Sequence, residues 1–193
     1  MKFLRDIIII IVIAVAIFAL LQATVGSYKV YGLCMLPNIH HGEYIIVNKA
    51  SYFFRSPQRG EVIVLHSPRD SNSALIKRII ALPGDTVEIN SNTVFVNGTP
   101  LVEPYILEPP DYVFPSQKIP TDHYFVLGDN RNNSADSHTG WTVPLEDIVG
   151  KAWLTYWPPP KWRTIKHYTL NVAEQMAELA KPSLAMKMPC PNK

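Results

Sequence analysis

The stretch GEVIVLHSPRDSNSALIKRIIAL, residues Gly60–Leu82, decides the fold class of this chain. It holds two runs of aliphatic and β-branched residues, and the segment between them is rich in serine, proline, aspartate and asparagine. Short apolar runs bounded by such turn formers are typical of β-strands. We therefore expect two strands in this stretch.

Similar runs recur from Ser27 to about Pro160, namely EYIIVNK (43–49), DTVEI (85–89), NTVFVNG (92–98), HYFVLGD (123–129) and IVGKAWLTYW (148–157). The dipeptide Asn97-Gly98 predicts a hairpin. Residues 103–120 contain too many prolines for a central strand and are expected to run over the surface. No helical pattern alternates with the runs, as a parallel sheet would require. The sequence therefore predicts a mostly β domain of antiparallel strands.

An almost uninterrupted apolar run, residues 7–25, follows Lys2 and Arg5 near the N-terminus. As a helix it would be about 28 Å long, close to the hydrocarbon thickness of a bilayer. The positive residues before it indicate a cytoplasmic N-terminus, with the rest of the chain beyond the plasma membrane. A cleaved secretory signal has the same basic start, but Leu21-Gln22-Ala23 is a poor cleavage site. An uncleaved anchor is therefore favoured.

The C-terminal part has a different character, with six lysines and arginines against two glutamates after Pro160. Val172, Met176 and Leu179 would share one side of a helix, which could rest on the domain or on an anionic bilayer. A solvated, partly ordered tail is the favoured alternative. We expect four parts: a cytoplasmic start (1–6), a transmembrane anchor (7–25), an extracytoplasmic β domain (26–160) and a basic tail (161–193).

The composition argues against two kinds of site. The formal charge is only +2, and no basic run is interleaved with aromatic residues as a nucleic-acid platform requires. The two cysteines, Cys34 and Cys190, are too few for a zinc site or a disulfide framework. A bridge between them would need an oxidising compartment and is not favoured, so each cysteine is considered alone.

Lys77 lies among apolar residues in the second run of the opening stretch. Side-chain alternation places it on one face with Leu75 and Ile79, and Arg78 on the other face. An ammonium group among apolar neighbours loses hydration, and a desolvated lysine can act as a general base. In the alternative interpretation, Lys77 or Arg78 lies at a strand edge and reaches water.

Two further segments carry reactive side chains. The loop GLCMLPN (32–38) places Cys34 between a flexible glycine and a turn-forming proline. The segment LGDNRNNSADSHTGW (127–141) combines turn formers with Ser134, Asp136 and His138, which could orient a base or pair with charges.

The apolar span and these motifs, in this order, resemble the bacterial type I signal peptidases, membrane-bound endopeptidases that remove signal peptides from exported proteins. Cys34–Asn38 is similar to the family's nucleophile box, roughly Ser-Met-x-Pro-Thr. RGEVIVL (59–65) and KRIIALPGD (77–85) are similar to its Arg-Gly-acidic strand and its lysine box, and GDNRNNSADSH (128–138) to its last box. The resemblance extends from the anchor to about Pro160, and the ordered set is far more specific than any single motif.

The resemblance implies a dyad of Cys34 as nucleophile and Lys77 as base. It implies that Ser134 orients the lysine, that Asp136 is a structural acid near the site and that Met35 forms the floor. It also implies a mostly β fold with an apolar surface against the lipid bilayer. The implied substrates are signal peptides cut at Ala-x-Ala-like sites, the secretion machinery is a further candidate partner, and neither metal nor cofactor is needed.

Three positions depart from the family pattern. Cys34 replaces a serine; a thiol is a strong nucleophile, but a thiolate–ammonium resting pair and a longer C–S bond would change the site. Gly32 stands where some members carry an oxyanion-hole serine, which leaves the Cys34 backbone N–H as the main donor. His138 replaces an arginine and could itself be the partner of Cys34, although the intact lysine box disfavours that. His40 and His41 are expected to be surface residues rather than a metal pair.

The cysteine leaves other functions open. Cys34 could belong to a natural cysteine-using member, to a deliberate serine-to-cysteine change, or to a weak or inactive homologue that binds signal peptides without turnover. A sortase-like transpeptidase would share the anchor, the β domain and a cysteine. It would place its Cys/Arg pair late in the chain, where no such pair is found.

Overall fold

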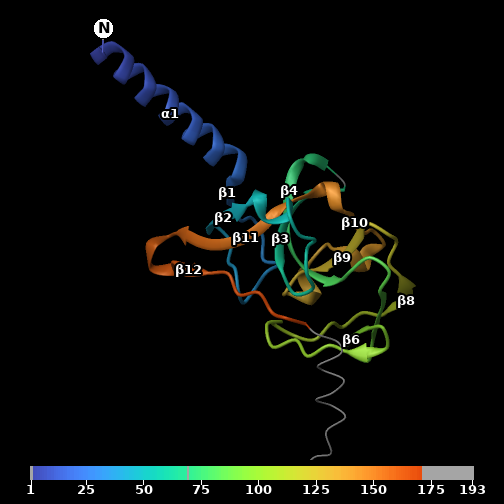
Figure 1. Ribbon diagram of the computed structural model, residues 1–193. Helices are drawn as coiled ribbons and strands as arrows, with labels where there is room; N and C mark the ends of the chain where they lie inside the picture. The colour runs from blue at the N-terminus through green and yellow to red at the C-terminus, as the bar shows by residue number, and fades with distance from the viewer. Residues whose placement is uncertain (1, 69, 171–193) are drawn as a thin grey trace, which may run out of the picture.

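A single long helix leads into a β domain. The computed structural model describes residues 2–68 and 70–170. Helix α1 (Lys2–Thr24) projects from the domain and passes directly into strand β1 (Val25–Lys29), as Figure 1 shows. The helix is long and apolar enough to cross a membrane and is not buried against the domain. It contains residues 7–24 of the expected anchor and begins earlier, at Lys2, within the expected cytoplasmic start, whereas Val25 already belongs to β1.

The larger sheet has eight strands, and all its pairings are antiparallel. Its order is β1-β2-β11-β3-β4-β9-β10, and β12 pairs with β11. The strands after β1 are β2 (Tyr44–Asn48), β3 (Val62–Ser67), β4 (Asp70–Ala81), β9 (His123–Leu127), β10 (Val143–Pro144), β11 (Ile148–Trp157) and β12 (Arg163–Thr164). The stretch 60–82 thus forms the central antiparallel pair β3–β4, and the prediction of a mostly β fold with one apolar N-terminal helix is confirmed.

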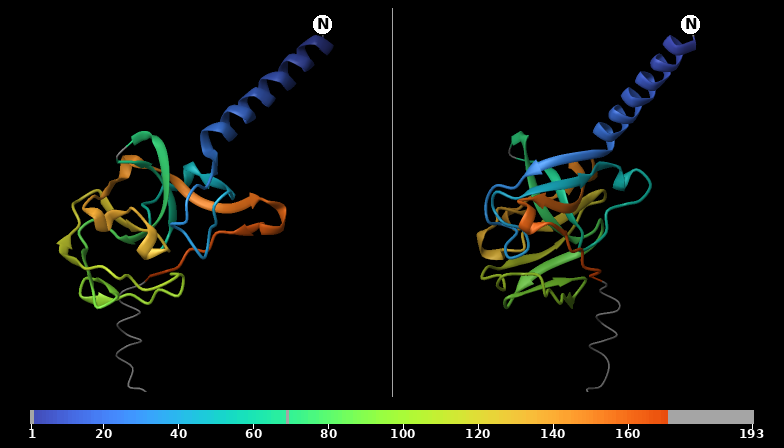
Figure 2. Two further views of the ribbon diagram at one scale, coloured as in Figure 1. Left: turned by 180° about the vertical axis from the view of Figure 1, so that it is seen from behind. Right: turned by 90° about the vertical axis from the view of Figure 1, so that its left-hand side faces the viewer.

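The smaller sheet has the order β7-β6-β5-β8 and lies at the end of the domain remote from α1, as both views of Figure 2 show. Its strands are β5 (Thr86–Asn90), β6 (Thr93–Val96), β7 (Thr99–Pro100) and β8 (Phe114–Lys118). Asn97 and Gly98 join β6 to β7 with φ angles of 52° and 76°, the positive values that an Asn-Gly hairpin adopts.

Residues 103–120 were expected to form a surface excursion, and the structure corrects this in part. They include β8, which lies at the edge of the smaller sheet, where a proline such as Pro115 needs no ladder partner. Phe114 at the start of β8 is buried and packs against Phe125. Part of the segment, β8, is therefore an edge strand, and Phe114 connects it to the core.

The central strands are buried on both faces. Val62 and Val64 of β3 pack in one apolar cluster with Met35, whereas Ile63 and Leu65 pack in another. A strand covered on both sides has no polar face, which explains why this run is continuously apolar rather than alternating. Four short 3₁₀ helices connect the strands: η1 (Lys49–Tyr52), η2 (Arg131–Asn133), η3 (Ser137–Thr139) and η4 (Leu145–Asp147).

The chain remains packed against the domain beyond the boundary expected at residue 160. A fifth 3₁₀ helix, η5 (Pro159–Lys161), leads into β12, and both Ile165 and Leu170 are buried. These apolar residues are interspersed among lysines and arginines, so the basic composition of this segment did not indicate that it packs against the domain. The packed domain extends at least to Leu170, and the remaining tail, with its expected helix and Cys190, lies outside the described residues.

Glu61 is a buried carboxylate at the start of β3 that joins several segments. It accepts hydrogen bonds from Arg55 (2.8 Å), Lys151 (2.8 Å), Tyr52 (2.9 Å) and the backbone N–H of Gln58 (3.1 Å). Burial alone would raise the pKa of Glu61, but these hydrogen bonds outweigh it and lower the pKa to about 2. A carboxylate with a lowered pKa stabilises the fold above its unfolded pKa, and this contribution is lost as the pH falls toward the folded value.

We predict that Glu61→Gln lowers the free energy of unfolding at pH 7 by about 3 kcal/mol, because the amide cannot pair with the two cations. The difference from wild type should shrink as the pH is lowered from 4.5 to about 2, where the wild-type carboxylate takes up its proton. Urea unfolding of the full chain in detergent micelles measures both effects. Glu108→Gln, which changes an exposed carboxylate, is the control and should stay within about 0.5 kcal/mol of wild type. A difference independent of pH would contradict the pairing.

Candidate active site

Cys34 lies in the loop of residues 32–38 between β1 and β2, here called the nucleophile loop after the role that the resemblance implies for Cys34. Its side chain is half-buried, and Sγ lies 3.8 Å from the backbone oxygen of Ile76 in β4. Met35 is 1% exposed and packs in the apolar cluster below the loop. The loop therefore rests on β4 at the residue that immediately precedes Lys77.

Lys77 is buried at the centre of the larger sheet. It is 2% exposed, and its register partner is Ile63 of β3. Its neighbour Arg78 is 1% exposed, so neither side chain reaches water from a strand edge. The alternative interpretation of the sequence is therefore wrong, and the amine of Lys77 is shielded from solvent.

Arg78 forms a buried, two-pronged ion pair with Asp129, which follows β9. The Nε–Oδ1 and Nη2–Oδ2 distances are both 2.8 Å, and the side chains are 1% and 0% exposed. Asn38, at the end of the nucleophile loop, donates from Nδ2 to the same Oδ2 (2.8 Å) and to the Tyr105 carbonyl (2.7 Å). One carboxylate thus joins the nucleophile loop to the strand that carries Lys77.

Gly128 and Asn130, on either side of Asp129, both contact the nucleophile loop. The backbone N–H of Asn130 donates to the Cys34 carbonyl (2.9 Å), and its Nδ2 donates to the Leu33 carbonyl (3.1 Å). A Cβ at Gly128 would collide with both the Ser134 side chain and the Cys34 carbonyl. Gly128 is therefore required for this close approach. The motif GDN was evident in the sequence, but only the fold shows what its residues contact.

Ser134 lies beside Cys34 but does not make the contact implied for it. Its hydroxyl is buried and has no hydrogen-bond partner among the described residues. The structure thus brings Ser134 to the site without a bond to Lys77.

Asp136 and His138 pair with each other. His138 Nδ1 lies 2.6 Å from Asp136 Oδ1, and the imidazole stacks on Tyr112 with 4.1 Å between ring centroids. The other oxygen, Oδ2, accepts the backbone N–H of Gly128 (2.8 Å). The histidine occupies the pairing role that the resemblance gives to an arginine. It contacts the aspartate, so the geometry does not favour a Cys34–His138 pair.

Gly32 is held by His41, which the sequence predicts only as a surface residue. Gly32 has a φ of 92°, and its N–H donates to Nδ1 of His41 (3.1 Å). His40 instead pairs with Glu43 (3.4 Å). The two histidines are exposed and have separate partners, and only the loop geometry identifies His41 as a support for Gly32.

An apolar groove of about 500 Å³ opens beside Cys34. Residues 28–31 and residues 73–76 of β4 line it. β3 pairs along most of β4, whereas β9 pairs with β4 only from Arg78 to Ala81. Within the described chain, no strand occupies the second edge of β4 at residues 73–77, so this edge is open toward the groove.

The family model described as "Signal peptidase, peptidase S26" matches residues 3–157. The chain belongs to this family. A probable signal peptidase I-1 from Synechocystis sp. is 39% identical over 176 residues, which covers 87% of this chain and 90% of that protein. A signal peptidase I from Leptolyngbya laminosa is 46% identical over 64% of both chains, and signal peptidase I U from Bacillus subtilis is 34% identical over 81% of this chain and 89% of its own. The predicted family and its hydrolase class are confirmed, and a sortase-like identity is excluded.

We predict that Gly128→Ala displaces Cys34 from its position against β4. Overpacking a tight contact of this kind typically destabilises a protein by about 1–3 kcal/mol, and a shift of about 1 Å at a catalytic group can lower turnover about 100-fold. Peptide-cleavage rates and thermal unfolding of the purified chain measure both effects. Gly140→Ala is the control for a glycine replacement without a steric collision: its Cβ meets nothing within 4 Å, although its φ of 97°, unlike the backbone of Gly128, is strained for alanine. Equal activity in the two variants would contradict the steric requirement.

Proposed function

We propose that this chain removes N-terminal signal peptides from exported pre-proteins at Ala-x-Ala-like sites, with Cys34 as nucleophile and Lys77 as general base. The observation that carries the proposal is the contact of Cys34 Sγ with the Ile76 carbonyl, one residue before the buried Lys77 and at the edge of an apolar groove. A thiol and a shielded amine on adjoining backbone are the two groups that acyl transfer of this kind requires.

The groove supports an extended peptide as the substrate. A peptide strand can add to an unpaired sheet edge through backbone hydrogen bonds, while shallow pockets select alternate side chains. The open edge of β4 at residues 73–77 offers such a position, and residues 28–31 would cover the peptide from the other side. Small side chains such as alanine suit this arrangement.

In the proposed reaction, Lys77 takes the thiol proton as the sulfur of Cys34 bonds to the scissile carbonyl carbon. The C–N bond then breaks, and the Lys77 ammonium gives its proton to the leaving amine, which becomes the new N-terminus of the mature protein. Water next attacks the thioester, Lys77 removes a proton from it, and the acid product leaves as the thiol is restored. The backbone N–H of Cys34 is the proposed donor to the oxyanion, and the bond from Gly32 to His41 holds the loop that presents it.

The same proposal places the chain in the plasma membrane with its N-terminus in the cytoplasm, residues 7–25 as anchor and the β domain outside. Arg5 lies at the N-terminal end of α1, in agreement with the positive-inside tendency. Phe53 and Phe54 follow η1, which contacts α1, and are 66% and 97% exposed. Aromatic side chains there suit the membrane interface. Pre-proteins delivered by the secretion machinery would meet the groove on this side.

We predict that the full chain in detergent cleaves a pre-protein with an Ala-x-Ala site, and that Lys77→Ala lowers the rate by at least about 100-fold because the thiol loses its base. Alkylation of Cys34 should abolish cleavage, and mass spectrometry of a quenched reaction should detect an acyl thioester on Cys34. Lys118→Ala, which removes an exposed lysine at the end of β8, is the control and should cleave like wild type.

Two results would contradict the proposed mechanism. Activity that survives alkylation would remove Cys34 from the reaction. Peptide binding without cleavage, with cleavage appearing in Cys34→Ser, would instead identify a homologue that holds signal peptides without turnover.

A further inference from the structure

The segment Arg163–Leu170, here called the strap, passes beside the end of the nucleophile loop, where Arg163 contacts Asn38. It begins at β12 and continues along the domain as the last described part of the chain (Figure 1). The family match ends at residue 157, so the strap lies outside the part of the chain that the family model describes. Its contacts nevertheless converge on the groups that position Cys34 and Lys77.

Arg163 contacts the chain after Cys34 at two residues, Asn38 and Glu43. Its Nη2 donates to the backbone oxygen of Asn38 (2.5 Å), at the end of the nucleophile loop. The same atom lies 2.7 Å from Oε2 of Glu43, whose side chain is 1% exposed. Burial raises the pKa of Glu43, but the contacts with Arg163, the His40 backbone and Lys161 together outweigh it and lower the pKa, so the carboxylate is charged at neutral pH.

The strap also reaches Arg78 on the other side of the site. Arg78 Nη1 donates to the Lys166 carbonyl (3.2 Å), and its guanidinium lies 5.2 Å from the centre of the Tyr168 ring. Arg78 in turn binds Asp129, which accepts from Asn38. The contacts therefore close a ring that runs from Arg163 through the nucleophile loop and back to the strap.

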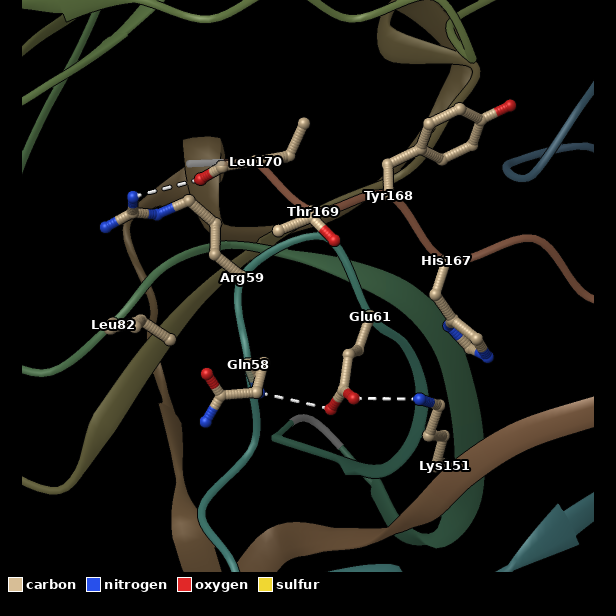
Figure 3. A pocket seen from close by; sticks show the side chains of 9 residues that line it. All are labelled: Gln58, Arg59, Glu61, Leu82, Lys151, His167, Tyr168, Thr169 and Leu170. Atoms are coloured by element: carbon tan, nitrogen blue, oxygen red, sulfur yellow. Dashed lines mark hydrogen bonds and ion pairs between the residues drawn. The ribbon is translucent and has the colours of Figure 1, made fainter. Parts of the chain in front are cut away.

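The far end of the strap is fixed independently. The Val62 N–H donates to Nδ1 of His167 (3.1 Å). Burial, and to a lesser extent the charge of Lys151, lowers the pKa of His167 to about 4. The imidazole is therefore neutral at pH 7, and its Nδ1 can accept this hydrogen bond. Arg59 donates to the Leu170 carbonyl (3.3 Å), as the close view in Figure 3 shows. The strap is thus held against the domain beyond its contacts with the site.

We propose that Arg163 is a positioning residue for the reaction, which sets the nucleophile loop relative to Lys77 through Asn38. The inference rests on the proposed function for the identity of the nucleophile and the base. Arg163 does not touch the substrate groove; it acts through the backbone of residue 38 and the ring of contacts that this residue shares with Arg78.

The test compares three variants of the full chain in a Cys190→Ser background, so that Cys34 is the only thiol. Arg163→Met removes the contacts of the guanidinium with Asn38 and Glu43, and also its bond to the Lys161 carbonyl (3.0 Å). Arg163→Lys keeps a cation opposite Glu43, but its Nζ ends one bond short of the position of Nη2, the atom that donates to both Asn38 and Glu43. Lys161→Met is the matched control: Lys161 lies 3.4 Å from Glu43, and none of its described contacts is with Asn38.

We expect Arg163→Met to lower kcat about 10- to 100-fold with KM changed less than about twofold, because the loop shifts while the groove stays intact. Arg163→Lys should show the same split with wild-type thermal stability, and Lys161→Met should match wild type. The rate of Cys34 alkylation by iodoacetamide is measured against pH in each variant. In both Arg163 variants this rate should rise about threefold or more at each pH, because a loop released at residue 38 exposes the half-buried Sγ of Cys34.

The alkylation profile separates this proposal from the proposed function, because it needs no turnover. If the wild type fails to cleave, a raised alkylation rate in the Arg163 variants still supports positioning. If Arg163→Met does not fold, Arg163→Lys decides. Wild-type kcat and an unchanged alkylation profile in Arg163→Lys, or equal losses in Lys161→Met, would overturn the proposal.

Discussion

The buried ion pair of Arg78 and Asp129 is the interaction on which the site depends. A guanidinium and a carboxylate removed from water are stable only if nearly all of their donors and acceptors are satisfied. Here Nη1 of Arg78 donates to the carbonyls of Gly60 and Lys166, and the carboxylate also accepts from Asn38. Meeting these requirements brings the nucleophile loop, two strands and the strap to one point. The pair therefore organises the site as well as filling the core.

Structural features that depend on residues close together in the chain could be predicted from the sequence. Features that depend on contacts between distant residues could not. The strands, the Asn97-Gly98 hairpin and the apolar helix follow from short-range pattern, and each is present. The contacts of Asn38 with Asp129 and of Gly32 with His41 join separate loops, which no local pattern specifies. The packing of residues 163–170 was obscured because its apolar side chains are interspersed with basic ones.

The departures from the family pattern leave the framework around them intact. Cys34 is held through its carbonyl and by loop contacts, none of which depends on whether the side chain ends in oxygen or sulfur. His138, where the family has an arginine, pairs with Asp136, and stacking on Tyr112 fixes its ring. Ser134 is the exception, because its buried hydroxyl has no partner in the described chain. Each of the three departing residues, at positions 32, 34 and 138, thus has defined contacts in the structure.

Helix α1 ends at Thr24 and β1 begins at Val25, so no linker separates the anchor from the sheet. A flexible tether would let the domain tumble and sample many heights above the bilayer. In the proposed membrane arrangement, the helix would instead limit the depth and the tilt of the domain, since β1 is paired with β2 along its whole length. Under the proposed function, the height of Cys34 above the membrane surface would then set where the cut falls along a substrate whose own segment is held in the membrane.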